Sequence, residues 1–221
     1  MWHIESLTRF ARPLVVVVVT FFGASIARAE DTYYVLIFGS QSEPKRPRLT
    51  HTWATFVRTV GDPAGPVARI ESFTISWMPA SLTVRPLALR PEVGTNLGLH
   101  ETLRAMYANG ESVSLWGPFR VSRELYQHAA GYKLRLESGQ LAYKAVDSRR
   151  PSPSISNCMH AVCDALGIPR GTIREEQVQG VAASASIAAL LVAGRQGISA
   201  PERDDWLIGR LGLSGYTIKR R

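Results

Sequence analysis

Cys158 is the residue of this chain whose type and position best suit covalent chemistry. It follows Ser156 and Asn157, two residue types that cap helix N-termini, after a loop broken by Pro153. A thiol in a first helical turn lies at the positive end of the helix dipole, which favours the thiolate over the thiol. The sequence therefore predicts a cysteine nucleophile, provided that a base lies beside it.

The base that we predict for Cys158 is His51. His160 follows the cysteine by two residues, so on a helix the two side chains point about 200° apart. His100 and His128 lie on expected helices among mixed neighbours, as surface or core histidines do. His51 instead opens a strand expected at the centre of the sheet. Strand starts and helix N-termini that meet at one sheet edge would bring His51 to the sulfur.

A third polar residue usually orients the imidazole of such a pair, and Glu71 is our candidate. It lies on the strand expected to pair with the His51 strand, on a largely apolar face where an unpaired carboxylate is costly. An ion pair with Arg58 or Arg69 is the alternative interpretation. If the strand register differs by one residue, the candidates become Ser72, Thr74 and Ser76.

Cys163 is the second cysteine, and we expect it to be a buried apolar residue. Five residues along a helix separate it from Cys158 by a rise of about 7.5 Å, which exceeds what a disulfide tolerates. Cys158, His160 and Cys163 have the right atoms for zinc, but their spacing matches no common zinc pattern. We therefore predict no disulfide within the chain and no metal or cofactor.

The first 29 residues have the pattern of a secretory signal. Arg9 and Arg12 precede the apolar run 14–24, and Ala27-Arg28-Ala29 supplies small residues for cleavage after Ala29. The run is shorter than the roughly 20 residues that a membrane span needs, although a retained anchor is the alternative. We predict export to the periplasm or the extracellular space, with no stable membrane span after cleavage.

Residues 30–221 have the length of one domain. The formal net charge of +8 suggests an anionic partner surface, such as phospholipid headgroups or cell-wall polymer. Runs of lysine and arginine interleaved with aromatic residues are absent from the sequence, which argues against a nucleic-acid partner.

The pattern of the chain predicts an α+β fold, an antiparallel sheet with helices packed on it. Asn96 and Ser122 are expected to cap two of the helices. The expected strands are 33–39, 50–60, 67–77, 111–121, 141–146 and 216–218, with a short edge strand near Thr83. The expected helices are 97–108, 123–136, a cysteine helix from 156 or 157 to 167, 182–193 and 201–211.

Two segments resemble a known superfamily. Asn157-Cys158-Met159-His160-Ala161-Val162 resembles the Asn-Cys-Glu-His-Phe-Val signature of the lecithin retinol acyltransferase family, within the circularly permuted papain-like (NlpC-type) hydrolases. His51-Thr52-Trp53-Ala54-Thr55-Phe56-Val57 resembles that group's histidine strand, and Ile70-Glu71-Ser72 falls where its third member is expected. Met159 and Ala161 replace the signature's glutamate and phenylalanine.

The resemblance implies a thiol hydrolase or acyltransferase. Cys158 would attack an amide or ester carbonyl after His51 takes its proton, and the Cys158 N–H would stabilise the oxyanion. The substrate would be a peptide, an amide or a lipid of the cell envelope. The competing hypothesis is a non-catalytic envelope-associated binding domain on the same scaffold, in which Cys158 is a buried helix residue.

Overall fold

The computed structural model describes residues 31–61, 69–147, 152–174, 179–194, 197–199 and 205–221. The strands are β1 (Thr32–Gln41), β2 (Thr50–Val60), β3 (Arg69–Ile75), β4 (Trp77–Pro79), β5 (Glu92–Asn96), β6 (Ser112–Val121), β7 (Ala142–Tyr143), β8 (Ile155–Ser156), β9 (Gly197–Ser199) and β10 (Ile218–Arg220). The helices are α1 (Leu99–Ala108), α2 (Arg123–Glu137), α3 (Cys158–Ala165), α4 (Val181–Ala193), α5 (Trp206–Arg210) and the 3-10 turns η1 (Pro47–Leu49) and η2 (Leu213–Gly215).

The main sheet has the strand order β10-β6-β1-β2-β3, with β9 also paired to β6. Its long central pairings, β1 with β2, β1 with β6 and β2 with β3, are antiparallel. A smaller sheet joins β4, β5, β7 and β8. The prediction of an α+β fold with a mostly antiparallel sheet is therefore confirmed.

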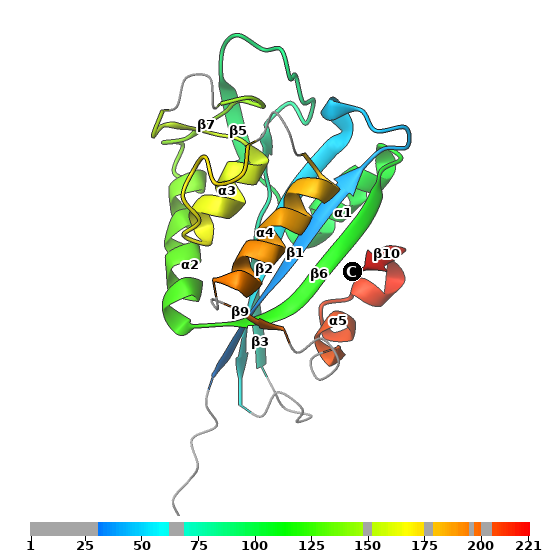
Figure 1. Cartoon of the computed structure of the whole chain (residues 1–221), viewed down its shortest axis with the longest axis vertical. Helices are drawn as coiled ribbons and strands as arrows, with labels where there is room; N and C mark the ends of the chain where they lie inside the picture. Colours follow the sequence, from blue (N-terminus) through cyan, green and yellow to red (C-terminus); the bar gives the residue numbers. More distant parts are fainter. Residues whose placement is uncertain (1–30, 62–68, 148–151, 175–178, 195–196, 200–204) are drawn as a thin grey trace, which may run out of the picture.

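Helices cover both faces of the main sheet (Figure 1). The helices α2, α3 and α4 cover what we call the α3 face, and α1 and α5 cover the α1 face. Side chains of a strand alternate between the two faces. On β2, Ala54 and Phe56 pack in the core of the α3 face, whereas Trp53 and Val57 pack in the core of the α1 face.

Most predicted elements are present, and several differ. The strand expected over 67–77 ends at Ile75 in the main sheet, and Trp77 begins β4 of the smaller sheet. Asn96 does not cap α1, because its side chain bonds the backbone of β3 and of the β3–β4 junction; Gly98 precedes the helix instead. The expected edge strand near Thr83 is a turn, and the strand of this region is β5. The last strand lies two residues later than expected because it pairs with β6. The two-residue strand β8 has too little pattern to be recognised.

Three predictions fall partly or wholly outside the described residues. These are the signal segment 1–29, the start of the strand expected over 67–77 and the start of the helix expected over 201–211. Among the described residues, no helix has both the length and the apolar character that crossing a bilayer requires.

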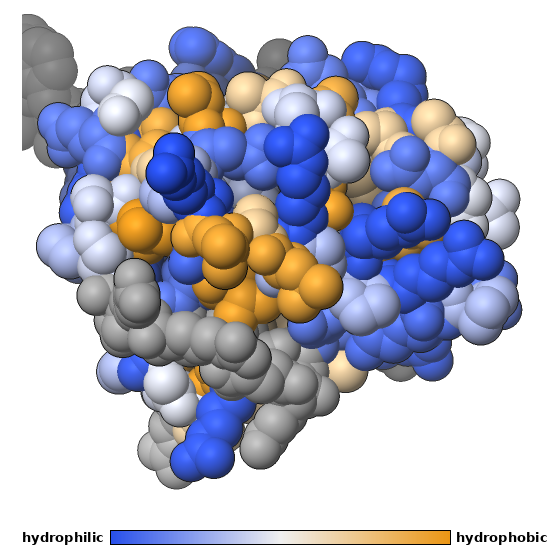
Figure 2. Space-filling model, turned by 90° about the horizontal axis from the view of Figure 1, so that it is seen from above, coloured by the Kyte–Doolittle hydropathy of each residue, from blue (hydrophilic) through white to orange (hydrophobic). Residues whose placement is uncertain are grey.

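Several loops meet at one end of the molecule, the end that is seen from above in Figure 2. The β1–β2 connection with η1, and the loop 80–91 between β4 and β5, both lie there. The starts of α3 and α4 also reach this end, since Cys158 and Gly180 line one pocket with Pro47 and Pro86. Any site built on Cys158 therefore opens toward this end.

Candidate functional site

Cys158 is the first residue of α3, as the capping pattern predicts. Asn157 is the N-cap residue, and its side-chain oxygen accepts a hydrogen bond from the backbone N–H of His160 at 2.8 Å. This bond satisfies one of the N–H groups that a helix start leaves open. The Cys158 side chain is half-buried, whereas the residues on either side of it are buried. The thiol is therefore held at the positive end of α3 without being sealed in the core.

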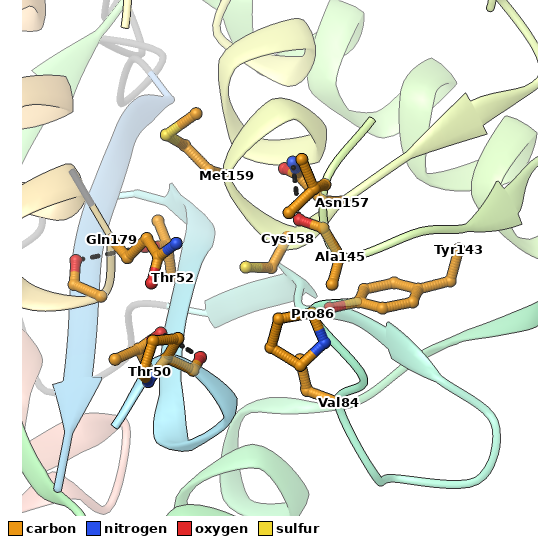
Figure 3. Close-up of a pocket in the computed structure, with 13 residues that line it drawn as sticks. Thr50, Thr52, Val84, Pro86, Tyr143, Ala145, Asn157, Cys158, Met159 and Gln179 are labelled. Atoms are coloured by element: carbon orange, nitrogen blue, oxygen red, sulfur yellow. Dashed lines mark hydrogen bonds between the residues drawn. The ribbon is translucent and has the colours of Figure 1, made fainter. Parts of the chain in front are cut away.

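The Cys158 thiol lines a small pocket (Figure 3). Thr50 and Thr52 of β2 form one wall, and Tyr143 and Pro86 stand on the opposite side. The cavity volume is ≈ 40 Å³, which is room for only a few water molecules. Among the described residues that line it, none is a histidine or a carboxylate. The pocket offers the thiol hydroxyl, amide and backbone groups but no imidazole.

His51 lies on the α1 face of β2. Its Nε2 is 2.8 Å from the Ser76 hydroxyl, which in turn accepts a hydrogen bond from Thr102 of α1 at 2.8 Å. The ring stacks on Trp53 with a centroid separation of 5.4 Å. Within the described part of the chain, Nδ1 is buried without a hydrogen-bond partner. Burial lowers the pKa of His51 to about 3, so the imidazole is neutral at physiological pH.

The structure does not bring His51 and Cys158 together. The residues of β2 that reach the Cys158 pocket are Thr50 and Thr52, the two neighbours of His51. Thr52 also bonds the carbonyl of Gly180 just before α4, which places its side chain on the α3 face. Because strand side chains alternate, His51 must then point to the opposite face. The predicted direct pair fails for this reason, although the two pockets adjoin at the end of β2, where Thr50 lines both of them.

Glu71 is also remote from His51. It pairs across the strands with Arg58, seven residues along β2 from His51, which corresponds to roughly 23 Å. Its carboxylate lies 3.2 Å from Arg58 and 2.9 Å from Arg69, on a partly exposed part of the sheet. Glu71 therefore forms the ion pairs that the sequence analysis gave as the alternative to an orienting role. Of the other candidates for the orienting residue, Ser76 is the one that contacts His51.

A buried polar cluster supports the start of α3 from behind. Asp147 Oδ1 lies 2.5 Å from His160 Nδ1 and accepts a bond from the Asn157 amide at 3.3 Å. The Asp147 and His160 side chains are only 1% and 6% exposed. Arg170 lies 3.7 Å from the other Asp147 oxygen. The cluster fixes Asn157 as the cap and thereby sets where the thiol of Cys158 lies.

Sequence reasoning missed the role of this cluster. The helical spacing correctly indicated that His160 is not the base for Cys158, but the sequence analysis assigned His160 no partner of its own. The partner, Asp147, lies in the charged segment between β7 and β8, and local sequence pattern does not predict where that segment runs in the fold. One sequence signal relates to this cluster: Asp147 precedes the Asn-Cys-x-His helix start by ten residues.

Cys163 is a buried thiol, as predicted. Its side chain is 2% exposed in the core of the α3 face, and burial raises its pKa to about 12. Neither Cys158 nor Cys163 forms a disulfide bond. The described residues contain no group of three or more histidine, cysteine, aspartate or glutamate side chains placed to hold a metal ion. Covalent chemistry on this face would therefore rest on Cys158.

Comparison with known protein families, with curated proteins and with solved structures finds no match to this chain.

Proposed function

We propose that this chain is a non-catalytic envelope-associated binding domain, the second of the two hypotheses that the sequence raises. The observation that carries the proposal is the position of His51 and Cys158 on opposite faces of β2. Acyl transfer by a cysteine at neutral pH depends on an imidazole or an equivalent base within hydrogen-bond reach. Such a base is absent among the described residues that line the thiol pocket.

The surroundings of His51 fit a structural role. Its Nε2 is engaged by Ser76, its ring is stacked on Trp53, and burial keeps it neutral. These contacts tie β2 to α1 through Thr102. An imidazole with a pKa of about 3 is also too weak a base to hold a thiol proton.

Cys158 supports a second candidate function, the thiol hydrolase or acyltransferase that the papain-like resemblance implies. It is half-buried at the start of α3 and lines an open pocket, unlike the buried helix residue that the binding hypothesis assumed. In this case the thiolate would attack an amide or ester carbonyl and expel the leaving group, which takes a proton from solvent to become the amine or alcohol. Water or an acceptor would then cleave the resulting thioester and restore Cys158. The thiol proton would pass to solvent, and the backbone N–H of Cys158 would stabilise the oxyanion.

The reaction of Cys158 with p-nitrophenyl acetate separates the two candidates. The binding domain should release about one nitrophenolate per protein, at a rate within about tenfold of a free cysteine of equal thiolate content. This single release should disappear in Cys158→Ser and persist in Cys163→Ser, because Cys163 is buried. The variant His51→Gln should leave the rate unchanged once its folding has been checked by circular dichroism.

Repeated turnover that is lost in Cys158→Ser would establish the hydrolase and refute the binding proposal, whether or not His51→Gln retains it. Sedimentation of the protein with an isolated cell-envelope fraction tests the proposed binding directly. Retention that does not change in Cys158→Ser is the expected result. A protein that stays in the supernatant would also refute the proposal.

A further inference from the structure

Large apolar side chains are exposed together on the loop between β4 and β5 and on β5 itself. We call this group the apolar tip; its members are Leu82, Leu87, Leu89 and Val93, with exposed fractions of 47%, 91%, 91% and 76%. Figure 2 shows apolar side chains gathered on this end of the molecule, bordered by hydrophilic ones. Clusters of this kind on a soluble surface mark interaction sites more often than single exposed leucines do.

Backbone hydrogen bonds support the tip. The backbone N–H of Ala80 bonds the carbonyl of Val93 at 2.8 Å, which closes the base of the loop. The backbone N–H of Ala88 donates a hydrogen bond to the carbonyl of Arg85 at 3.0 Å and closes a turn beside Leu87 and Leu89. Leu82 has a φ of 54°, the left-handed region that is costly for a leucine. A strained backbone that leaves leucines in water points to a function for the tip.

Cations surround the tip. The exposed basic residues of 43–48 and 82–93 are Lys45, Arg46, Arg48, Arg85 and Arg90, against the acidic residues Glu43 and Glu92. The two segments lie side by side, because Arg48 and Leu82 line one pocket and Pro47 and Val84 line another. The charge around the apolar side chains is therefore net positive.

We propose that the apolar tip inserts into an anionic phospholipid surface. The inference rests on the proposed envelope-binding function and names its partner. Leucines that project from a frame of arginines match the layers of a bilayer surface, where apolar side chains enter the acyl boundary and cations bind the phosphates. A protein partner would instead have to bury three leucines and a valine and neutralise several arginines within one small patch.

This orientation also explains the position of the thiol pocket. Val84 and Pro86, in the same loop as Leu87 and Leu89, line the pocket that holds Cys158 (Figure 3). Insertion of the tip would place the pocket mouth at the level of the lipid headgroups. A lipid headgroup or acyl ester would then be the group that meets the thiol.

Vesicle sedimentation of the purified protein tests the proposal. We expect binding to vesicles of equal phosphatidylglycerol and phosphatidylcholine, weakened by salt, and little binding to phosphatidylcholine alone. The double variant Leu87→Asp, Leu89→Asp should bind at least about tenfold more weakly. The matched control is Leu134→Asp on α2, a leucine that is 69% exposed and outside the tip; its binding should stay within about twofold of wild type.

Arg85→Glu with Arg90→Glu should also weaken binding and remove its salt dependence.

Other results would overturn the lipid assignment. Equal vesicle binding by wild type and by the double leucine variant would exclude the tip as the inserted element. A dimer in analytical ultracentrifugation that the leucine variant abolishes would make a second copy of the chain the occupant. Binding to purified peptidoglycan without binding to vesicles would refute lipid insertion while leaving the broader envelope-binding function intact.

Discussion

The two faces of β2 at its N-terminal end hold different kinds of chemistry, although they are one residue apart in sequence. On the α3 face, Thr50 and Thr52 line a pocket with the half-buried thiol of Cys158 at the start of α3. On the α1 face, His51 is sealed between Ser76 and Trp53. A cysteine and a histidine in the right order along the chain therefore do not form a pair unless they also share a face of the sheet.

The two faces also differ in what keeps their polar groups in place. The α3 face relies on a buried charged residue, Asp147, which bonds His160 and Asn157. On the α1 face, a neutral imidazole contacts hydroxyl groups, and the buried carboxylate that lines the same pocket, Glu111, accepts a hydrogen bond from Ser40. Removing a buried charge costs more than removing a neutral group, because its partners are left without compensation. The comparison thus predicts unequal responses to substitution and to pH.

The largest effect should follow from Asp147→Ala on the α3 face. The substitution leaves His160 and the Asn157 amide buried without their common acceptor, and Arg170 loses a neighbouring charge. We expect the free energy of unfolding to fall by about 3 kcal/mol, measured by urea unfolding. Asp205→Ala is the control; Asp205 pairs with Arg220 but its side chain is 59% exposed, so the loss should stay below about 1 kcal/mol. Equal losses in the two variants would refute the supporting role of Asp147.

A smaller effect, dependent on pH, should come from His51 on the α1 face. Its pKa is about 3 in the folded protein and 6.5 as the ordinary value, so the unfolded chain binds a proton that the folded chain excludes. The contribution of neutral His51 to stability is complete above pH 6.5 and declines as the pH falls toward 3. The slope is about 1.4 kcal/mol per pH unit between these values.

The variant His51→Gln isolates this contribution. Urea unfolding of both proteins from pH 7.5 to 4.5 should give a difference in stability that shrinks as the pH falls. Glu111 lines the same pocket as His51, and burial raises its pKa, so its own titration acts in the opposite direction. Because Glu111 is present in both proteins, it cancels to first order. A difference that stays constant over this pH range would show that His51 is protonated in the fold.

The fold was largely predictable from sequence because its long elements carry strong local signals. β2 was predicted at its observed bounds, since β-branched and aromatic residues fill the run and Gly61 ends it. Ser122 caps α2 as expected, and Asn157 caps α3. These signals lie within a few residues of each other, so they do not depend on tertiary contacts.

The site was less predictable because β2 is buried on both faces. In a half-buried strand, polar and apolar residues alternate and reveal which side chains point inward. In β2, Trp53 and Val57 on one face are as apolar as Ala54 and Phe56 on the other. The sequence therefore carries no sign of which face holds α3, and the side on which His51 lies could not be read. The Asp147 cluster was hidden for a related reason, since only the tertiary fold brings it to α3.

The smallest effect should come from moving an imidazole to the other face of β2. Thr50→His puts a histidine on the wall of the Cys158 pocket, where an imidazolium would favour the thiolate. We expect the apparent pKa of Cys158 to fall by about one unit, which makes alkylation by iodoacetamide at pH 6 about tenfold faster. Leu49→His is the matched control, because Leu49 lines the pocket that contains His51 and not the one that contains Cys158. An equal acceleration in both variants would mean that an imidazole on the His51 side also acts on Cys158, and the placement of His51 on the α1 face would then no longer explain why the two residues do not pair.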